Sequence, residues 1–360
     1  MRETVSLWRL FGIMCFFLIL VGCRSAREFT MSPSPAIEET GVQLLSSPTS
    51  TVTIALPTTT PSVRYQLTFT SVQRVGYSQQ MYAIEVGCLT EEIPCFGEPE
   101  LLFEVPWPGR VGLPIFSFDW SPDGRRVVWE DGLINERGDI VVADWNGQNR
   151  INLSRSPGPD GFPDWSADGT KIIFTTKIDP YKIVLMVVTP DGKESAEFLT
   201  KSIEVKDPAM ASFSPDGKQV VFQDYRVEGP FEGLYQIFLA NLDGTKLIQL
   251  TSALTNHYYP SFSPDGNWVV FSREMDPNEP DTHIFLIWSD GSDEVSLTEN
   301  MPGTQSKPAW APFGGWIAFI ATVEGVDSLY LIKADGSQLM QVSQDIGDIG
   351  YIAWRTVFEP

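Results

Sequence analysis

A short pattern of apolar and polar positions recurs five times along this chain and predicts β-hairpins. In 120–129 an aromatic residue is followed by Ser-Pro-Asp-Gly, two polar residues, two valines and a second aromatic residue. β-Branched and aromatic residues favour strands, whereas Pro, Asp and Gly favour a tight turn because of the backbone conformations and hydrogen bonds that they supply. Close copies occupy 213–222 and 262–271, and looser copies occupy 165–174 and 310–319.

A second pattern follows each hairpin and completes a repeat of four strands. An apolar strand such as 237–242 ends in an Asp-Gly or Asn-Gly turn, and a short strand then closes on an apolar residue and a hydroxyl residue, as in Leu250-Thr251. The hairpin glycines lie 45, 48, 49 and 48 residues apart. A period of this length indicates a repeat array, and four-stranded units favour a β-propeller over a stacked solenoid.

The two ends of the chain indicate the number of blades. Five units fill about 114–343, and 350–355 matches the first strand of a further unit. Near the other end, three strand-like segments lack such a first strand, namely 65–70, 81–86 and 101–105. We therefore predict an all-β, six-bladed propeller of four-stranded blades, in which the C-terminal strand joins the N-terminal blade. Closing the ring in this way removes open sheet edges.

The repeat resembles that of a known family. The Ser-Pro-Asp-Gly hairpin, the later Asp-Gly turn and the closing Leu-Thr pair look like the propeller repeat of the TolB family, which also occurs in prolyl oligopeptidase-type enzymes. The resemblance covers about 63–360 and implies the fold, but this scaffold serves unrelated functions. We find no segment that predicts the α/β domain of TolB or a hydrolase domain, so we expect neither a Tol–Pal role nor peptidase activity.

The N-terminal segment predicts export. Residues 1–22 combine a basic start with an apolar run of twelve residues, 10–21, which is too short to span a bilayer but typical of a signal peptide. The segment ends in Leu-Val-Gly-Cys, which resembles a bacterial lipobox and implies cleavage before Cys23 and lipid attachment to it. The alternative is an ordinary secretory signal. We expect an extracytoplasmic protein that is held on the bacterial membrane only by the lipid on Cys23.

A linker and a cysteine pair complete the predicted organisation. Half of the forty residues 24–63 are Ser, Thr or Pro, so 23–62 is expected to be a disordered tether ahead of a propeller at 63–360. Cys88 and Cys95 lie close together in the first blade and predict a disulfide in an exported protein, with two free thiols as the alternative.

The charge of the mature chain limits its partners. Removing 1–22 takes away Arg2, Glu3 and Arg9, which leaves 23 basic and 45 acidic residues and a net charge of −22. This balance disfavours nucleic acid and direct docking on anionic lipid, since both require basic surface. It suits solubility outside the cell, or the binding of a cation or a basic partner.

The candidate site lies on the face opposite the stereotyped turns, which we call the variable face. This face carries the loops between second and third strands and the links between blades, where length varies. Paired Arg and Glu with clustered Tyr can hold a peptide terminus or stack on a sugar, and a solvated loop is the alternative. The candidate residues are Asp224, Tyr225, Arg226, His257, Tyr258, Tyr259, Arg273 and Glu274.

Catalytic motifs are scarce. The chain has two histidines, no Gly-x-Ser-x-Gly elbow and no phosphate-binding glycine loop, so we predict no catalytic residue, no metal site and no cofactor. We predict a monomeric, non-catalytic lipoprotein of the cell envelope that captures a protein, a peptide or a glycan. The alternative is an extracytoplasmic carbohydrate-active hydrolase or lyase that uses carboxylates or calcium, and a purely structural surface protein is the third reading.

Overall fold

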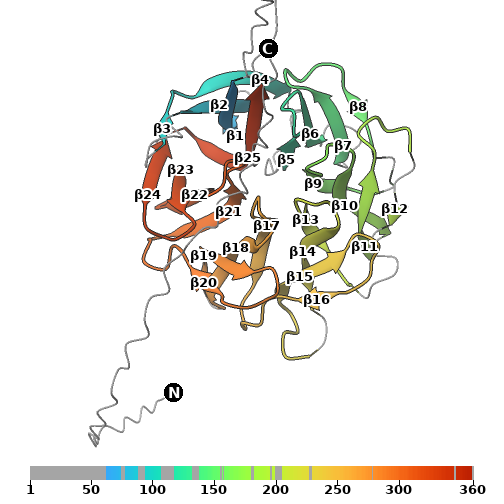
Figure 1. The fold of residues 1–360 in the computed structure, drawn as a ribbon, viewed down its shortest axis with the longest axis vertical. Helices are drawn as coiled ribbons and strands as arrows, with labels where there is room; N and C mark the ends of the chain where they lie inside the picture. The colour runs from blue at the N-terminus through green and yellow to red at the C-terminus, as the bar shows by residue number, and fades with distance from the viewer. Residues whose placement is uncertain are drawn as a thin grey trace, which may run out of the picture. The chain divides into compact units, whose positions relative to one another are not determined.

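The computed structural model shows a ring of six antiparallel β-sheets around a central channel (Figure 1). The chain passes once around the ring, and each sheet forms one blade. The predicted six-bladed β-propeller is therefore confirmed. The described residues are 62–73, 78–87, 94–106, 117–131, 138–154, 156, 158–179, 182–194, 197–198, 205–226, 229–277, 279–343 and 346–358.

Several sequence predictions fall on residues outside this described part. The predicted signal segment, Cys23 and nearly all of the linker lie there, and so does Cys88. Cys95 opens the short strand β3 (Cys95–Phe96). The lipid anchor, the linker and the disulfide therefore stay predictions. Among the described residues, no helix is long and apolar enough to cross a membrane.

Five blades contain four consecutive strands each, numbered from the channel outward. In each of them the Ser-Pro-Asp-Gly turn or its equivalent joins the first strand to the second. The second blade has β5 (Phe118–Trp120), β6 (Arg126–Asp131), β7 (Asp139–Asp144) and β8 (Ile151–Asn152); the third has β9 (Asp160–Trp165), β10 (Ile172–Asp179), β11 (Lys182–Val188) and β12 (Glu197–Phe198). The fourth has β13 (Ala209–Phe213), β14 (Gln219–Tyr225), β15 (Tyr235–Asn241) and β16 (Ile248–Gln249); the fifth has β17 (His257–Phe262), β18 (Trp268–Asp276), β19 (Glu279–Trp288) and β20 (Val295–Ser296). The sixth has β21 (Thr304–Trp310), β22 (Trp316–Val323), β23 (Val326–Lys333) and β24 (Leu339–Ser343).

The first blade joins the two ends of the propeller. Its inner strand is the C-terminal β25 (Asp348–Phe358), which pairs with β1 (Val63–Gln73), and β1 pairs with β2 (Ser78–Gly87). The outer position is divided between β3 and β4 (Glu100–Pro106), which both pair with β2. Closure of the ring by the C-terminal strand is thus as predicted.

Side-chain hydrogen bonds within the turn explain why the Ser-Pro-Asp-Gly pattern recurs along the chain. In the second blade, Ser121 Oγ donates to Asp123 Oδ1 and accepts from the backbone N–H of Arg126 at 2.9 Å. The same Asp carboxylate accepts from the N–H of Arg125, and Gly124 has φ +63°. Serine and aspartate therefore satisfy the turn backbone, and glycine provides the left-handed conformation that an L side chain resists.

The core lies between neighbouring blades. The aromatic residue that ends each repeated hairpin pattern is almost fully buried. Phe174, Phe222, Phe271 and Phe319 are at most 1% exposed. One cluster joins Ile237 of the fourth blade to Phe262 and Phe271 of the fifth. Each blade therefore buries its apolar face against the next blade, and no blade has a complete core of its own.

A buried arginine fastens the first blade to the second. Arg355 of β25 is 8% exposed, and its Nε donates to the carbonyl oxygen of Gly124 at 2.9 Å. Its Nη1 donates to Gln66 Oε1 at 3.1 Å, and its guanidinium lies 4.7 Å from the ring centre of Trp120. Backbone hydrogen bonding and a cation–π contact thus hold the closing strand.

The closing contact predicts a difference between two turn glycines. A Cβ at Gly124 would lie 1.8 Å from the carbonyl oxygen of Thr356 in β25, whereas a Cβ at Gly217 would meet nothing within 4 Å. Both glycines have positive φ. We expect Gly217→Ala to lower the free energy of unfolding by about 1–2 kcal/mol through backbone strain alone. Gly124→Ala is expected to cost about 1–3 kcal/mol more, because the closing strand must shift.

Urea denaturation of the two purified variants measures this difference. Equal losses of stability in Gly124→Ala and Gly217→Ala would show that β25 does not pack against the second-blade turn as described.

Candidate functional site

The predicted site residues gather at one boundary of the ring. Asp224, Tyr225 and Arg226 lie at and after the end of β14, and the remaining five lie on β17 and β18. They therefore come from the fourth and fifth blades, which are neighbours. Within this group the structure separates a row of surface aromatic side chains from a buried network.

Four tyrosines form a continuous row on the variable face. Ring centres are 5.2 Å apart for Tyr225 and Tyr235, 5.8 Å for Tyr235 and Tyr258, and 6.4 Å for Tyr258 and Tyr259. We call these four residues the tyrosine row. All four are partly exposed. Tyr235 was absent from the candidates, but it pairs directly with Tyr225 across β14 and β15.

Carboxylates hold two hydroxyls of the tyrosine row. Tyr235 Oη donates to Asp207 Oδ2 at 3.1 Å, and Tyr258 Oη donates to Glu274 Oε1 at 3.2 Å. Burial, with the nearby Asp207 charge, raises the pKa of Tyr235 to about 12. Burial and the Glu274 charge also raise the pKa of Tyr258 above its ordinary value. Both tyrosines stay neutral at physiological pH, and their rings are fixed in orientation.

Two exposed apolar side chains lie close along the chain to residues that form or hold the tyrosine row. Leu254, in the link before β17, is 61% exposed, and Met275, next to Glu274, is 41% exposed. Glu274 also accepts hydrogen bonds from the backbone and side chain of Asn256, which holds the link against β18. Aromatic residues and methionine are enriched in protein interfaces. The variable face of these two blades therefore has the composition of a binding surface.

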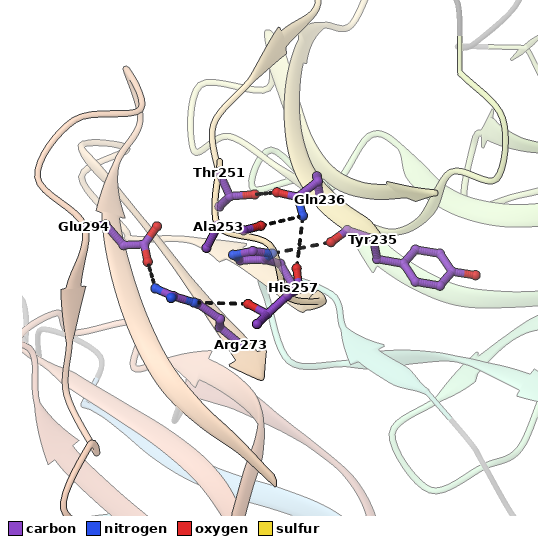
Figure 2. A network of polar contacts seen from close by, with 8 residues as sticks. Tyr235, Gln236, Thr251, Ala253, His257, Arg273 and Glu294 are labelled. Atoms are coloured by element: carbon purple, nitrogen blue, oxygen red, sulfur yellow. Dashed lines mark hydrogen bonds and ion pairs between the residues drawn. The ribbon is translucent and has the colours of Figure 1, made fainter. Parts of the chain in front are cut away.

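Two predicted residues, His257 and Arg273, take part in a network of polar contacts, which Figure 2 shows. His257 is fully buried, its ring packs against Phe271, and its Nδ1 is 3.4 Å from the carbonyl oxygen of Tyr235. Burial, with the Arg273 charge, lowers the pKa of His257 to about 4. The imidazole is therefore neutral at physiological pH and supports the backbone that carries the row.

Arg273 is held by contacts within the protein. Its guanidinium lies 4.8 Å from the ring centre of Phe285, forms an ion pair with Glu294, and donates through Nε to Thr255 Oγ1 at 3.3 Å. Nearby, the buried Gln236 donates to the carbonyl oxygens of Ala253 and Thr255 (Figure 2). These bonds fix the link that presents Leu254.

Asp224 and Arg226 also make internal contacts. Asp224 is fully buried and accepts hydrogen bonds from the backbone N–H groups of Lys206 and Asp207. Arg226 lies 5.2 Å from the ring centre of Phe238 and 3.8 Å from Asp224 Oδ2. Asp224 therefore positions the backbone of Asp207, the hydrogen-bond partner of Tyr235.

The tyrosine row leads into the central channel. Tyr259 lines a cavity of about 150 Å³ to which all six inner strands contribute. Four inner strands have a non-glycine residue with positive φ at equivalent bulged positions, where the chain re-aims its side chains toward the channel. These residues are Phe162, Met210, Tyr259 and Lys307.

Two carboxyls, which sequence reasoning missed, lie in the channel wall. Asp119 Oδ2 accepts from the N–H of Trp165 at 2.7 Å, and Asp164 Oδ2 accepts from the N–H of Phe213 at 2.9 Å. Burial raises the pKa of Asp119 to about 7, and burial together with Asp119 raises the pKa of Asp164. The sequence does contain a signal for these two carboxyls. Directly before the first aromatic residue of the repeated pattern, two repeats have Asp and the others have Ser or Ala.

A second acidic pair lies between the second and third blades. Burial, with the charge of Asp160, raises the pKa of Glu130 to about 8. A Cβ at Gly138 or Gly161 would come within 2.8 Å or 2.7 Å of the Glu130 carboxylate oxygens, so glycine leaves room for this side chain. Across the described part of the chain, no three His, Cys, Asp or Glu side chains are grouped in a way that could hold a metal ion.

Comparison with known proteins identifies the family of this propeller. Residues 110–358 match the TolB beta propeller domain, and the chain belongs to this family. It is 28% identical over 157 residues to the uncharacterized peptidase YuxL of Bacillus subtilis, which covers 43% of this chain and 21% of that protein. It is 30% identical over 121 residues to the TolB homolog of Chlorobaculum tepidum, which covers 34% of this chain and 26% of that protein. The chain thus spans about a quarter of the length of these two relatives.

A solved structure supports the fold. TolB from Acinetobacter baumannii superposes with a TM-score of 0.62 at 18% identity, over 81% of this chain and 66% of that one. At this identity the likeness establishes the architecture and leaves the activity to be argued from the site.

The raised pKa of Glu130 predicts a pH-dependent stability. Because the folded state holds this proton up to about pH 8 and the unfolded state releases it near 4.5, the stabilising effect of the proton is lost as pH rises through this window. We expect the free energy of unfolding of Glu130→Gln, relative to that of the native chain, to rise by on the order of 3 kcal/mol between pH 5 and pH 9. Denaturation curves at several pH values, with the exposed Glu232→Gln as control, measure this gain. A constant difference between Glu130→Gln and the native chain across the range would contradict it.

Proposed function

We propose that this protein is a non-catalytic binding scaffold of the bacterial cell envelope and that it captures a protein partner on its variable face. The observation that carries the proposal is the tyrosine row, which reaches the channel cavity at Tyr259, together with the exposed Leu254 and Met275 nearby in the chain. Tyrosine is among the residue types that supply most of the binding energy where proteins meet, and aromatic residues and methionine are enriched there. The TolB-like propeller provides a rigid frame for such a surface.

The hydrogen bonds of the row favour a protein or peptide over a glycan. The hydroxyls of Tyr235 and Tyr258 already donate to Asp207 and Glu274, so they have no proton to offer to a sugar. Leu254 and Met275 present only apolar surface, which a protein side chain can cover. The net charge of −22 after removal of 1–22 favours a partner with basic groups.

The location of this scaffold follows from the N-terminal prediction. In our proposal, 1–22 directs export, the lipid on Cys23 anchors the chain, and the Ser/Thr/Pro-rich segment 23–62 tethers the propeller. The apolar run and the Leu-Val-Gly-Cys sequence support this arrangement.

One observation favours a second function, a carbohydrate-active hydrolase or lyase. A carboxyl with a pKa near 8, as at Glu130, is protonated at neutral pH, which a general acid requires. Neither Glu130 nor Asp160 lines the channel cavity. Release of reducing ends from envelope polysaccharides by the native chain, and its loss in Glu130→Gln, would establish this function in place of the binding scaffold.

The binding proposal predicts that apolar residues beside the row are required for partner capture. We expect Leu254→Glu with Met275→Glu to reduce capture about tenfold or more, since a carboxylate that is covered on docking loses its water and apolar contact is lost. The matched control is Val295→Glu with Leu339→Glu, two residues that are 49% and 48% exposed on outer strands. Crosslinking in intact cells followed by quantitative mass spectrometry measures the recovery of each captured protein.

Recovery of the same proteins in equal amounts from both double variants would contradict a docking site beside the tyrosine row.

A further inference from the structure

We propose that the central channel binds a primary ammonium group, which a lysine side chain of the docked partner or a small free amine supplies. The lysine source rests on the proposed function. The binding of the ammonium group itself does not, because it depends only on the residues of the channel wall.

The channel cavity has a suitable size. Its volume is about 150 Å³, and an engineered protein cavity of about this volume holds a benzene molecule. An ammonium group on a four-carbon chain, the end of a lysine side chain, is of similar bulk. The tyrosine row reaches this cavity at Tyr259, so that a side chain of a partner docked on the row can enter it.

The acidic side of the cavity lacks a counter-charge. Asp119 and Asp164 lie on the adjacent inner strands β5 and β9, and both line the cavity. Their Oδ2 atoms accept backbone N–H groups, but among the described residues neither carboxyl forms an ion pair. Enclosed carboxylates require a paired cation or a proton. An entering cation can therefore take the place of a proton on these carboxyls.

Aromatic rings around the carboxyls favour an ammonium group over a metal ion. Phe162, Tyr259 and Tyr351 line the same cavity, and the faces of aromatic rings attract ammonium groups. A calcium ion takes six to eight oxygen ligands. The described residues contain no metal-binding group of three His, Cys, Asp or Glu side chains. Two acids and several aromatic rings match the chemistry of an amine.

Lys307 is a basic residue in the lining of the cavity. It lies on β21 of the sixth blade, its Nζ donates to the carbonyl oxygen of Gly350 at 2.6 Å, and it is 5.9 Å from the ring centre of Tyr259. Burial lowers the pKa of this lysine. The titratable groups of the cavity are therefore Asp119, Asp164, Tyr259, Lys307 and Tyr351, and Lys307 opposes the entry of a second cation.

Binding of an ammonium group is linked to proton release. Burial raises the pKa of Asp119 to about 7, so Asp119 holds its proton at pH 6 and has lost most of it at pH 8, while burial and the Asp119 charge raise the pKa of Asp164 as well. An incoming cation favours the ionised carboxylate and displaces this proton. Affinity should therefore rise about tenfold from pH 6 to pH 8, while the amine itself remains charged.

The test is calorimetric titration of the full chain with n-butylamine at pH 6 and pH 8, in buffers of different ionisation enthalpy. We expect stronger binding at pH 8, with release of up to one proton. Asp119→Asn with Asp164→Asn should weaken binding at least tenfold and abolish the proton release, since Asn keeps an oxygen for the backbone N–H. Lys307→Gln should strengthen binding several-fold, and sodium butyrate should not bind.

Thermal unfolding checks that each variant is folded. If the double variant Asp119→Asn with Asp164→Asn does not fold, the two single variants Asp119→Asn and Lys307→Gln complete the test. The proposal is overturned if butylamine does not bind, if the Asn variants bind it unchanged, or if calcium binds in its place.

Partner capture distinguishes the two sources of the amine. Reduced capture by Asp119→Asn with Asp164→Asn would support a lysine of the partner, whereas unchanged capture alongside butylamine binding would support a free amine. Because the titration requires no partner, the amine site and the docking surface beside Leu254 and Met275 can each fail alone.

Discussion

The pairing of β25 with β1 is the constraint on which the rest of this structure depends. It joins segments at opposite ends of the propeller, from Val63 with Phe358 to Val72 with Asp348, and it gives the first blade its inner strand. Since each blade buries its apolar face against the next, opening the ring would expose a core surface at two blades. The same strand supplies Tyr351 to the channel wall. Closure thus creates both the stability of the propeller and the cavity at its centre.

The bulges of the inner strands connect this frame to the site. A non-glycine residue with positive φ costs about 1–2 kcal/mol, yet Phe162, Met210, Tyr259 and Lys307 all adopt it at equivalent positions. At each bulge the strand presents a large side chain to the channel. At Tyr259 the bulge also places the last ring of the tyrosine row in the wall of the channel cavity.

Much of the fold could be predicted from the sequence because the turns that define it are local. Ser121, Asp123 and Gly124 satisfy their own turn, and the pattern recurs every 45 to 49 residues. The site was only partly predictable. Tyr225, Tyr258 and Tyr259 stood out as clustered aromatics in variable segments, but Tyr235 joins them through strand register. The burial of His257 and the internal contacts of Arg273 depend on tertiary packing, and the proximity of Asp119 to Asp164 depends on the order of blades around the ring, which no local pattern contains.

The most direct test of the binding surface is photocrosslinking from single positions on the propeller in intact cells. A benzophenone amino acid at Met275, beside the tyrosine row, is compared with the same residue at Leu339, which is exposed on β24 of the sixth blade. We expect a discrete crosslinked protein from position 275 and none from position 339. Identical crosslinks from both positions, or a discrete product from 339 alone, would contradict a binding surface at the boundary of the fourth and fifth blades.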